Sequence, residues 1–93
     1  MSEKEHVVIT VTGTDRVGIV AGVAKALADA NANIIDISQT IMQGIFVMIL
    51  MVDISQAKYD LNALEEFLAA AGTELGVKIT VQHEDIFRYM HRI

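Results

Sequence analysis

The chain has 93 residues, of which 53% are hydrophobic and 20% charged, and its mean hydropathy is +0.43. Its net charge of −5 argues against direct nucleic-acid binding, because phosphate contacts need clustered Lys and Arg. Since the sequence has no cysteine, disulfides, thiolate chemistry and cysteine-based zinc sites are excluded. One small domain cannot easily hide this much apolar surface, so we expect a homodimer.

Membrane insertion is not expected. The first six residues are charged and contain no apolar signal region. The longest apolar run, Ile45 to Val52, is too short to cross a bilayer. We therefore expect one domain over residues 1–93, located in the cytoplasm and without a membrane partner.

The first elements predicted are a strand and a helix. Apolar and polar residues alternate from Val7 to Thr12 with many β-branched side chains, which is typical of a strand, and Gly13 ends it. An alanine-rich helix follows and closes at residues 31–33, where Asn suits a left-handed conformation. The buried stripe of this helix is expected to contain Val20, Val23, Ala24, Leu27 and Ala28.

A hairpin comes next. Strands are predicted over Ile34–Met42 and Ile45–Asp53, and Gln43 and Gly44 between them suit a tight turn. The second of these strands is apolar on both faces. One face is expected to take helices, and the other needs a partner.

The last elements predicted are a second helix, a fourth strand and a tail. Asp60 suits the N-cap of an amphipathic helix that ends at Gly76, with Glu65 and Glu66 exposed. Its apolar positions are Leu61, Leu64, Phe67, Leu68, Ala71 and Leu75. A strand follows over Val77–Gln82. Residues 83–93 are expected to form a short helical tail with one apolar side, made of Ile86, Phe87, Met90 and Ile93.

The order of the elements predicts the fold class. A β-α-β-β-α-β chain with right-handed crossovers forms an α+β ferredoxin-like sandwich. The expected four-stranded antiparallel sheet has the order 4-1-3-2, with two helices on one face.

The turn between the first strand and the first helix is the main candidate for function. Backbone N–H groups gather at a helix start and can hold a small anion or a carboxylate. In the alternative interpretation, Thr14 or Asp15 caps the helix and Gly18 makes a tight turn, with no ligand.

Two segments carry a family resemblance. Residues 12–20 read TGTDRVGIV after a strand, and residues 32–35 read ANII after an alanine-rich helix. This pattern resembles the ACT domain, a ferredoxin-like small-molecule sensor attached to many amino-acid biosynthetic enzymes. The resemblance covers essentially the whole chain. It is closest to free-standing single-ACT proteins and to the paired ACT domains of the glycine cleavage system transcriptional repressor.

The resemblance implies an amino-acid site between two chains. In the family, the ligand lies between the loop after the first strand and the start of the second strand of a neighbouring domain. Carried over to this sequence, one side is made of Thr14, Asp15, Arg16, Val17, Gly18 and Ile19. The other side is made of Asn33 and Ile34 of the neighbour.

Two loop positions depart from the family pattern. Val17 stands where proline is frequent, and Asp15 stands where some amino-acid-binding members have asparagine. An ionised Asp15 accepts hydrogen bonds only, so it suits the ammonium group of a ligand and repels a carboxylate. The carboxylate would then need N–H groups near residues 17–19.

Other residues leave two interpretations open. Asn33 can end the helix instead of touching a ligand, and Arg16 can be solvated surface instead of an anion contact. His6 and His83 lie near strand ends that the topology brings together, and with Glu84 or His91 they would suit a transition metal. We expect two exposed histidines instead, with no metal and no cofactor.

The residue types do not indicate an enzyme. The sequence has no Ser-His-Asp or Cys-His set, no phosphate-binding glycine loop, and no carboxylates paired for acid–base chemistry. We predict a regulatory protein that senses an amino acid or a similar small metabolite at the interface of a homodimer. The alternative is a protein-interaction module without a small-molecule ligand.

Overall fold

The computed structural model describes residues 5–14 and 17–83, and it contains the predicted elements in the predicted order. They are β1 (His6–Thr14), α1 (Ile19–Asp29), β2 (Asn33–Met42), β3 (Ile45–Asp53), α2 (Leu61–Leu75) and β4 (Val77–His83). The predicted helical tail lies outside the described residues from residue 84 onward. Neither described helix is long and apolar enough to cross a membrane.

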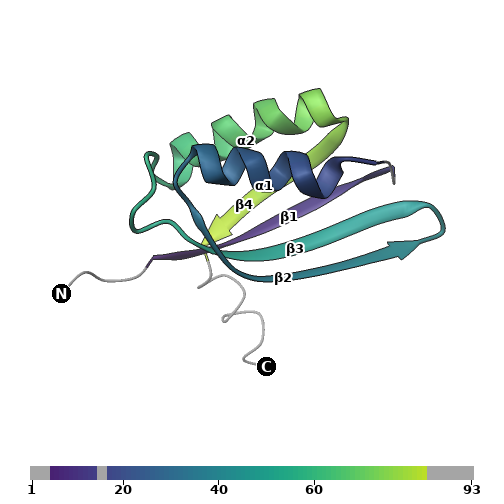
Figure 1. Cartoon of the computed structure of the whole chain (residues 1–93), viewed down its shortest axis with the longest axis horizontal. Helices are drawn as coiled ribbons and strands as arrows, with labels where there is room; N and C mark the ends of the chain where they lie inside the picture. Colours follow the sequence, from purple (N-terminus) through teal and green to yellow (C-terminus); the bar gives the residue numbers. More distant parts are fainter. Residues whose placement is uncertain (1–4, 15–16, 84–93) are drawn as a thin grey trace.

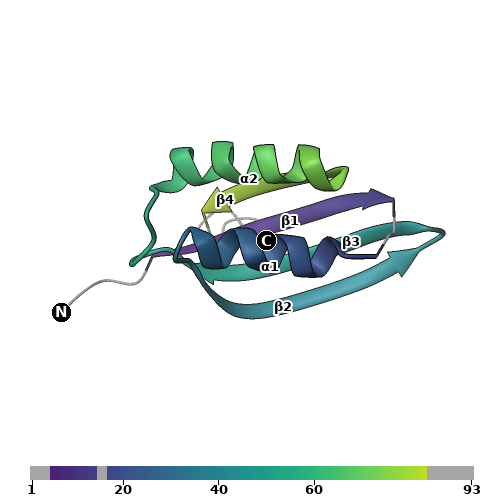
Figure 2. The same ribbon diagram turned by 45° about the horizontal axis from the view of Figure 1, so that its top comes forward.

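The four strands form one sheet in the order β2-β3-β1-β4, and all three neighbouring pairs are antiparallel. Both helices lie on the same face of this sheet (Figures 1 and 2). The predicted ferredoxin-like sandwich and its strand order are confirmed.

The core lies between the helices and one face of the sheet. Strand register puts Val11 opposite Met48 and Ile79, and Ile9 opposite Leu50 and Val81, so alternate residues of three strands face the helices. The buried side chains that complete this core include Leu27 of α1 and Leu64 and Leu68 of α2. On the other face of β3, Ile45 and Ile49 are exposed, as expected for a strand that is apolar on both sides.

Turn and cap residues behave as the sequence predicts. Gln43 and Gly44 both have positive φ, 52° and 82°, which a tight hairpin turn of this type requires. The Asp60 carboxylate caps α2 by accepting a hydrogen bond from the Ala63 N–H at 2.9 Å, and Gly76 ends the helix in a left-handed conformation. Asn31 follows α1 with φ 61°.

The predicted stripe of α1 is wrong in part. Val23 and Leu27 are buried as expected, but the other buried positions of the helix are Ile19 and Ala26 instead of Val20, Ala24 and Ala28. An alanine-rich helix has little difference in size between its faces, so the sequence pattern does not fix its rotation. Ile19, assigned above to the loop, is one of the buried residues of this helix.

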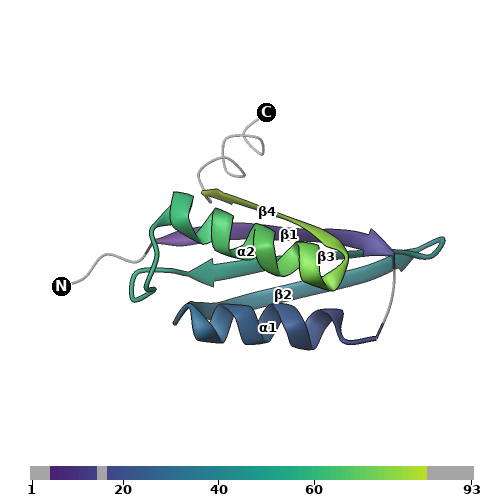
Figure 3. The same ribbon diagram turned by 90° about the horizontal axis from the view of Figure 1, so that it is seen from above.

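The two helices lie over opposite edges of the same sheet face. Seen from above, α1 runs along the β2 side and α2 along the β4 side (Figure 3). Along β2 the burial decreases: Ile34 is half-buried, Ile37 is 45% exposed and Ile41 is 56% exposed. The sheet side of β2 is therefore covered near its start and open near its end.

Gly72 sets how closely α2 approaches β4. A Cβ built at Gly72 would lie 2.7 Å from the carbonyl oxygen of Val77, which is backbone and cannot rotate away. We expect Gly72→Ala to lower the free energy of unfolding by about 1–3 kcal/mol through overpacking, although alanine favours helices. Chemical denaturation measures this change.

Thr73→Ala is the control for the Gly72 variant, because Thr73 is exposed and lies on the same helix. It is expected to change stability by less than about 0.5 kcal/mol. Equal effects of the two substitutions would contradict the close approach.

Candidate functional site

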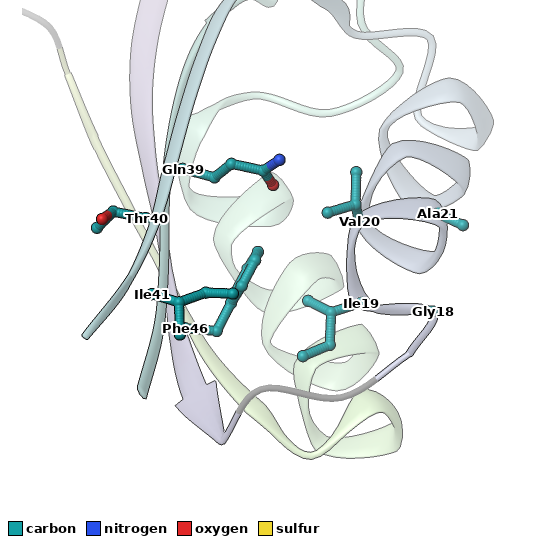
Figure 4. A pocket seen from close by; sticks show the side chains of 8 residues that line it. All are labelled: Gly18, Ile19, Val20, Ala21, Gln39, Thr40, Ile41 and Phe46. Carbon is teal, nitrogen blue, oxygen red and sulfur yellow. The ribbon is translucent and has the colours of Figure 1, made fainter. Parts of the chain in front are cut away.

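A cavity of about 550 Å³ lies between the start of α1 and the end of β2. Gly18, Ile19, Val20 and Ala21 form its helical side. Gln39, Thr40 and Ile41 of β2 and Phe46 of β3 form its sheet side. Figure 4 shows the side chains of Ile19, Val20, Gln39, Ile41 and Phe46 facing the space between helix and strand, whereas those of Thr40 and Ala21 turn away. The cavity opens where β2 is no longer covered.

Among the described residues, no side chain caps the start of α1. Its N-cap is Gly18, whose φ of 94° is left-handed and favours glycine, and no side chain there accepts a hydrogen bond. The first turn also has no acidic residue. By contrast, α2 has the Asp60 cap. The first N–H groups of α1 therefore lie beside the cavity at the positive end of the helix.

This geometry corrects one interpretation of the loop. Thr14 was one of two residues expected to cap α1, but the N-cap position belongs to Gly18. Thr14 is the exposed last residue of β1. The other candidate, Asp15, lies outside the described residues, as does Arg16.

The described loop residues of the predicted site have different environments. Gly18 and Ile19 line the cavity, and Ile19 is 2% exposed, with its side chain in the core. Val17 is fully exposed. The structure thus brings two of the predicted residues to the cavity through the start of α1.

Asn33 and Ile34 are far from this loop within one chain. Asn33 pairs with Asp53, and Asp53 pairs with His6, so the start of β2 lies at the sheet end where β1 begins. The loop follows the other end of β1. Because β2 has 10 residues, its ends are about 30 Å apart at about 3.3 Å per residue. One chain alone does not bring the two halves of the predicted site together.

The sequence pattern did not indicate that a cavity would be lined by Val20, Gln39, Ile41 and Phe46. The period-two alternation placed Gln39 and Ile41 on one face of a strand, but the same pattern is typical of a covered core strand. Only the position of α1 relative to the sheet shows that this part of β2 is uncovered.

The histidine pair does not form a metal site among residues 5–14 and 17–83. His83 pairs with Val7, the residue that follows His6. Because side chains alternate along a strand, the two imidazoles point to opposite faces of the sheet. No group of three His, Cys, Asp or Glu residues that could hold a metal occurs in this part of the chain.

Comparison with known proteins identifies the family. A model of the ACT domain matches residues 5–82. A UPF0237 protein from Methanocaldococcus jannaschii is 63% identical over 88 residues, which cover 95% of this chain and 98% of that protein. An ACT domain protein from Streptococcus pneumoniae has a TM-score of 0.81 at 41% identity, covering 91% of this chain and 96% of that one.

A solved structure assigned as a glycine cleavage system transcriptional repressor is also similar. Its TM-score is 0.74 at 26% identity, and the match covers 88% of this chain and 47% of that one. The resemblance that the sequence indicated is thereby confirmed. The chain belongs to the ACT domain family.

Proposed function

We propose that this chain is a regulatory amino-acid sensor that acts as a homodimer, with one ligand site at each end of the interface. The observation that carries the proposal is the cavity beside the start of α1, where the N-cap is Gly18. A free amino acid brings a carboxylate, which the N–H groups at the positive end of α1 can bind. Its ammonium group can be bound by the Asp15 carboxylate.

The edge of β2 supports the dimer. It is an outer strand of the sheet and has 10 residues, against seven for the opposite edge β4. Ile35, Ile37 and Ile41 are each at least 45% exposed, and no described segment pairs with the outer edge of β2. Long apolar edges of this kind associate with other strands unless they are covered. A second copy is the proposed cover.

Antiparallel pairing of β2 with its copy also explains how the two halves of the site meet. In a two-fold arrangement, the start of one β2 lies beside the end of the other. Asn33 and Ile34 of one chain then lie near Met42 of its partner, at the sheet end that holds Gly18. The pairing brings together residues that are about 30 Å apart within one chain.

Ligand binding at such a site is coupled to assembly. A ligand that contacts both chains binds the dimer and not the separated monomers, so it shifts the population toward the dimer. At 100 times its Kd, a ligand contributes about 2.7 kcal/mol to stability. A protein that binds only the dimer would respond to this change in the dimer population, which is the regulatory signal.

The first prediction concerns ligand binding. We expect at least one of the twenty amino acids to raise the Tm by about 10 °C or more near saturation, given about 4–8 °C per kcal/mol for a domain of this size. Asp15→Ala and Asn33→Ala are expected to remove this shift without unfolding the protein. Differential scanning fluorimetry provides the measurement.

Two substitutions outside the proposed site serve as controls, because each removes the same type of side chain, a carboxylate or an amide. Asp29→Ala changes an exposed carboxylate at the far end of α1, and Asn62→Ala changes an exposed amide on α2. Both should keep the full shift. If no amino acid shifts the wild-type Tm, the sensor proposal is wrong, and the protein-interaction module becomes the better explanation.

The second prediction concerns the dimer. If Asn33 faces Met42 across the interface, the register shift of β2 between Ile34 and Asp36 puts Ser38 at the two-fold axis, and the two Ile37 side chains lie diagonally across it on the same face of the sheet. Ile37→Glu then brings two carboxylates close together, and sedimentation velocity at micromolar concentration should show a monomer instead of the wild-type dimer. Ile37→Lys should dissociate for the same reason.

Mixing the two Ile37 variants should restore a dimer, because opposite charges then lie diagonally across the axis. Ala69→Glu adds the same charge to an exposed position on α2 and should leave the dimer intact. A wild-type monomer, or an Ile37→Glu dimer, would contradict pairing through β2.

A further inference from the structure

The side chains that face the cavity are almost entirely hydrocarbon. Ile19 and Phe46 form its inner wall and are 2% and 5% exposed, while Val20 and Ile41 stand closer to solvent. Gln39 supplies the one polar side chain among the described residues that points into the space (Figure 4). The cavity therefore offers one amide and four apolar groups to whatever enters it.

Charge is missing from this wall. None of the eight lining residues is ionisable. Asp36, the charged residue of β2, pairs with Met51, whereas Gln39 pairs with Met48, so Asp36 lies on the opposite face of the sheet. A charged group inside the cavity would lose water beside hydrocarbon and gain no described counter-ion, which is strongly unfavourable.

The polar and apolar features occupy different parts of the cavity. The N–H groups of α1 are at the loop end, next to Gly18, whereas Ile19 and Phe46 lie deeper between helix and sheet. An α-amino acid has the same division, with a charged backbone portion and a separate side chain. The volume of about 550 Å³ lies within the usual range for small-molecule sites and leaves room for a long side chain.

We propose, building on the amino-acid site of the preceding section, that the ligand is an amino acid with a large apolar side chain. The side chain enters between Val20, Ile41 and Phe46, and the backbone groups stay at the start of α1. Affinity then depends on how much hydrocarbon the ligand buries. Amino acids with charged side chains are excluded by the uncharged wall.

A homologous series tests the proposal on the wild-type protein. Alanine, 2-aminobutyrate, norvaline and norleucine differ only by methylene groups, and each buried methylene should lower Kd about fourfold. Lysine is norleucine with an added ammonium group, so it should bind at least 100-fold more weakly. Isothermal titration calorimetry measures these constants.

Two substitutions and one control test whether the residues that line the cavity cause the preference for an apolar side chain. Ile41→Asp places a carboxylate where the side chain of the ligand ends, so the ratio of lysine to norleucine affinity should rise by at least tenfold. Thr40→Asp is the matched control, because the Thr40 side chain turns away from the cavity, and it should leave the ratio unchanged. Gln39→Leu adds no charge to the interface and should tighten norleucine binding.

The outcomes separate this inference from the proposed function. If no amino acid binds, the proposed function fails. If amino acids bind but Kd is flat across the series, or lysine equals norleucine, the apolar side-chain inference alone is wrong.

The variants give a second way to overturn the inference. It is wrong if Thr40→Asp changes the ratio as much as Ile41→Asp does, or if Gln39→Leu leaves norleucine affinity unchanged. Circular dichroism and sedimentation confirm that each variant remains folded and dimeric. If Ile41→Asp dissociates the dimer, Gln39→Leu alone decides the result.

Discussion

The separation of β2 from α1 produces the candidate ligand cavity of this protein. The end of α1 lies close to the start of β2, since only residues 30–32 connect them, and the twist of the sheet then separates the end of β2 from the start of α1. Ile34 is still half-buried, whereas Ile37 and Ile41 are largely uncovered. A cavity therefore forms at the end of β2, and the same strand presents an apolar edge to solvent.

This arrangement makes one strand responsible for two contacts. One face of β2 lines the cavity through Gln39 and Ile41, and its outer edge is the proposed contact with a second copy. A change at the edge therefore also changes the shape of the cavity mouth. If the ligand site is shared by two chains, as proposed above, it exists only while the chains are together, so this strand couples ligand binding to assembly.

Most of the fold could be predicted from local sequence. Gln43 and Gly44, Asp60, and Gly76 act through backbone conformation or a single hydrogen bond, so their neighbours in sequence are enough to identify them. Strand alternation identified which residues share a face, and the order of elements then gave the topology. These features depend on periodicity and turn chemistry, which short stretches of consecutive residues determine.

The cavity could not be predicted in the same way. Its residues come from α1, β2 and β3, and they meet only because of the rotation of α1 and the twist of the sheet. The alanine-rich sequence leaves that rotation undetermined, as the misplaced Val20 shows. The loop residues Asp15 and Arg16 entered through family resemblance, whereas Ile41 and Phe46 needed the three-dimensional arrangement.

The central place of β1 has a consequence for how the protein is made. β1 precedes both of its partners, β3 and β4, in the chain, and Val7 pairs with His83 near the end of the described residues. Both edges of β1 therefore remain unpaired until β3 and β4 have been synthesised. Contacts between residues so distant in sequence slow folding, because a long loop must close first. A chain that lacks β4 would leave one edge of the apolar strand β1 unpaired, and exposed strand edges of this kind promote aggregation.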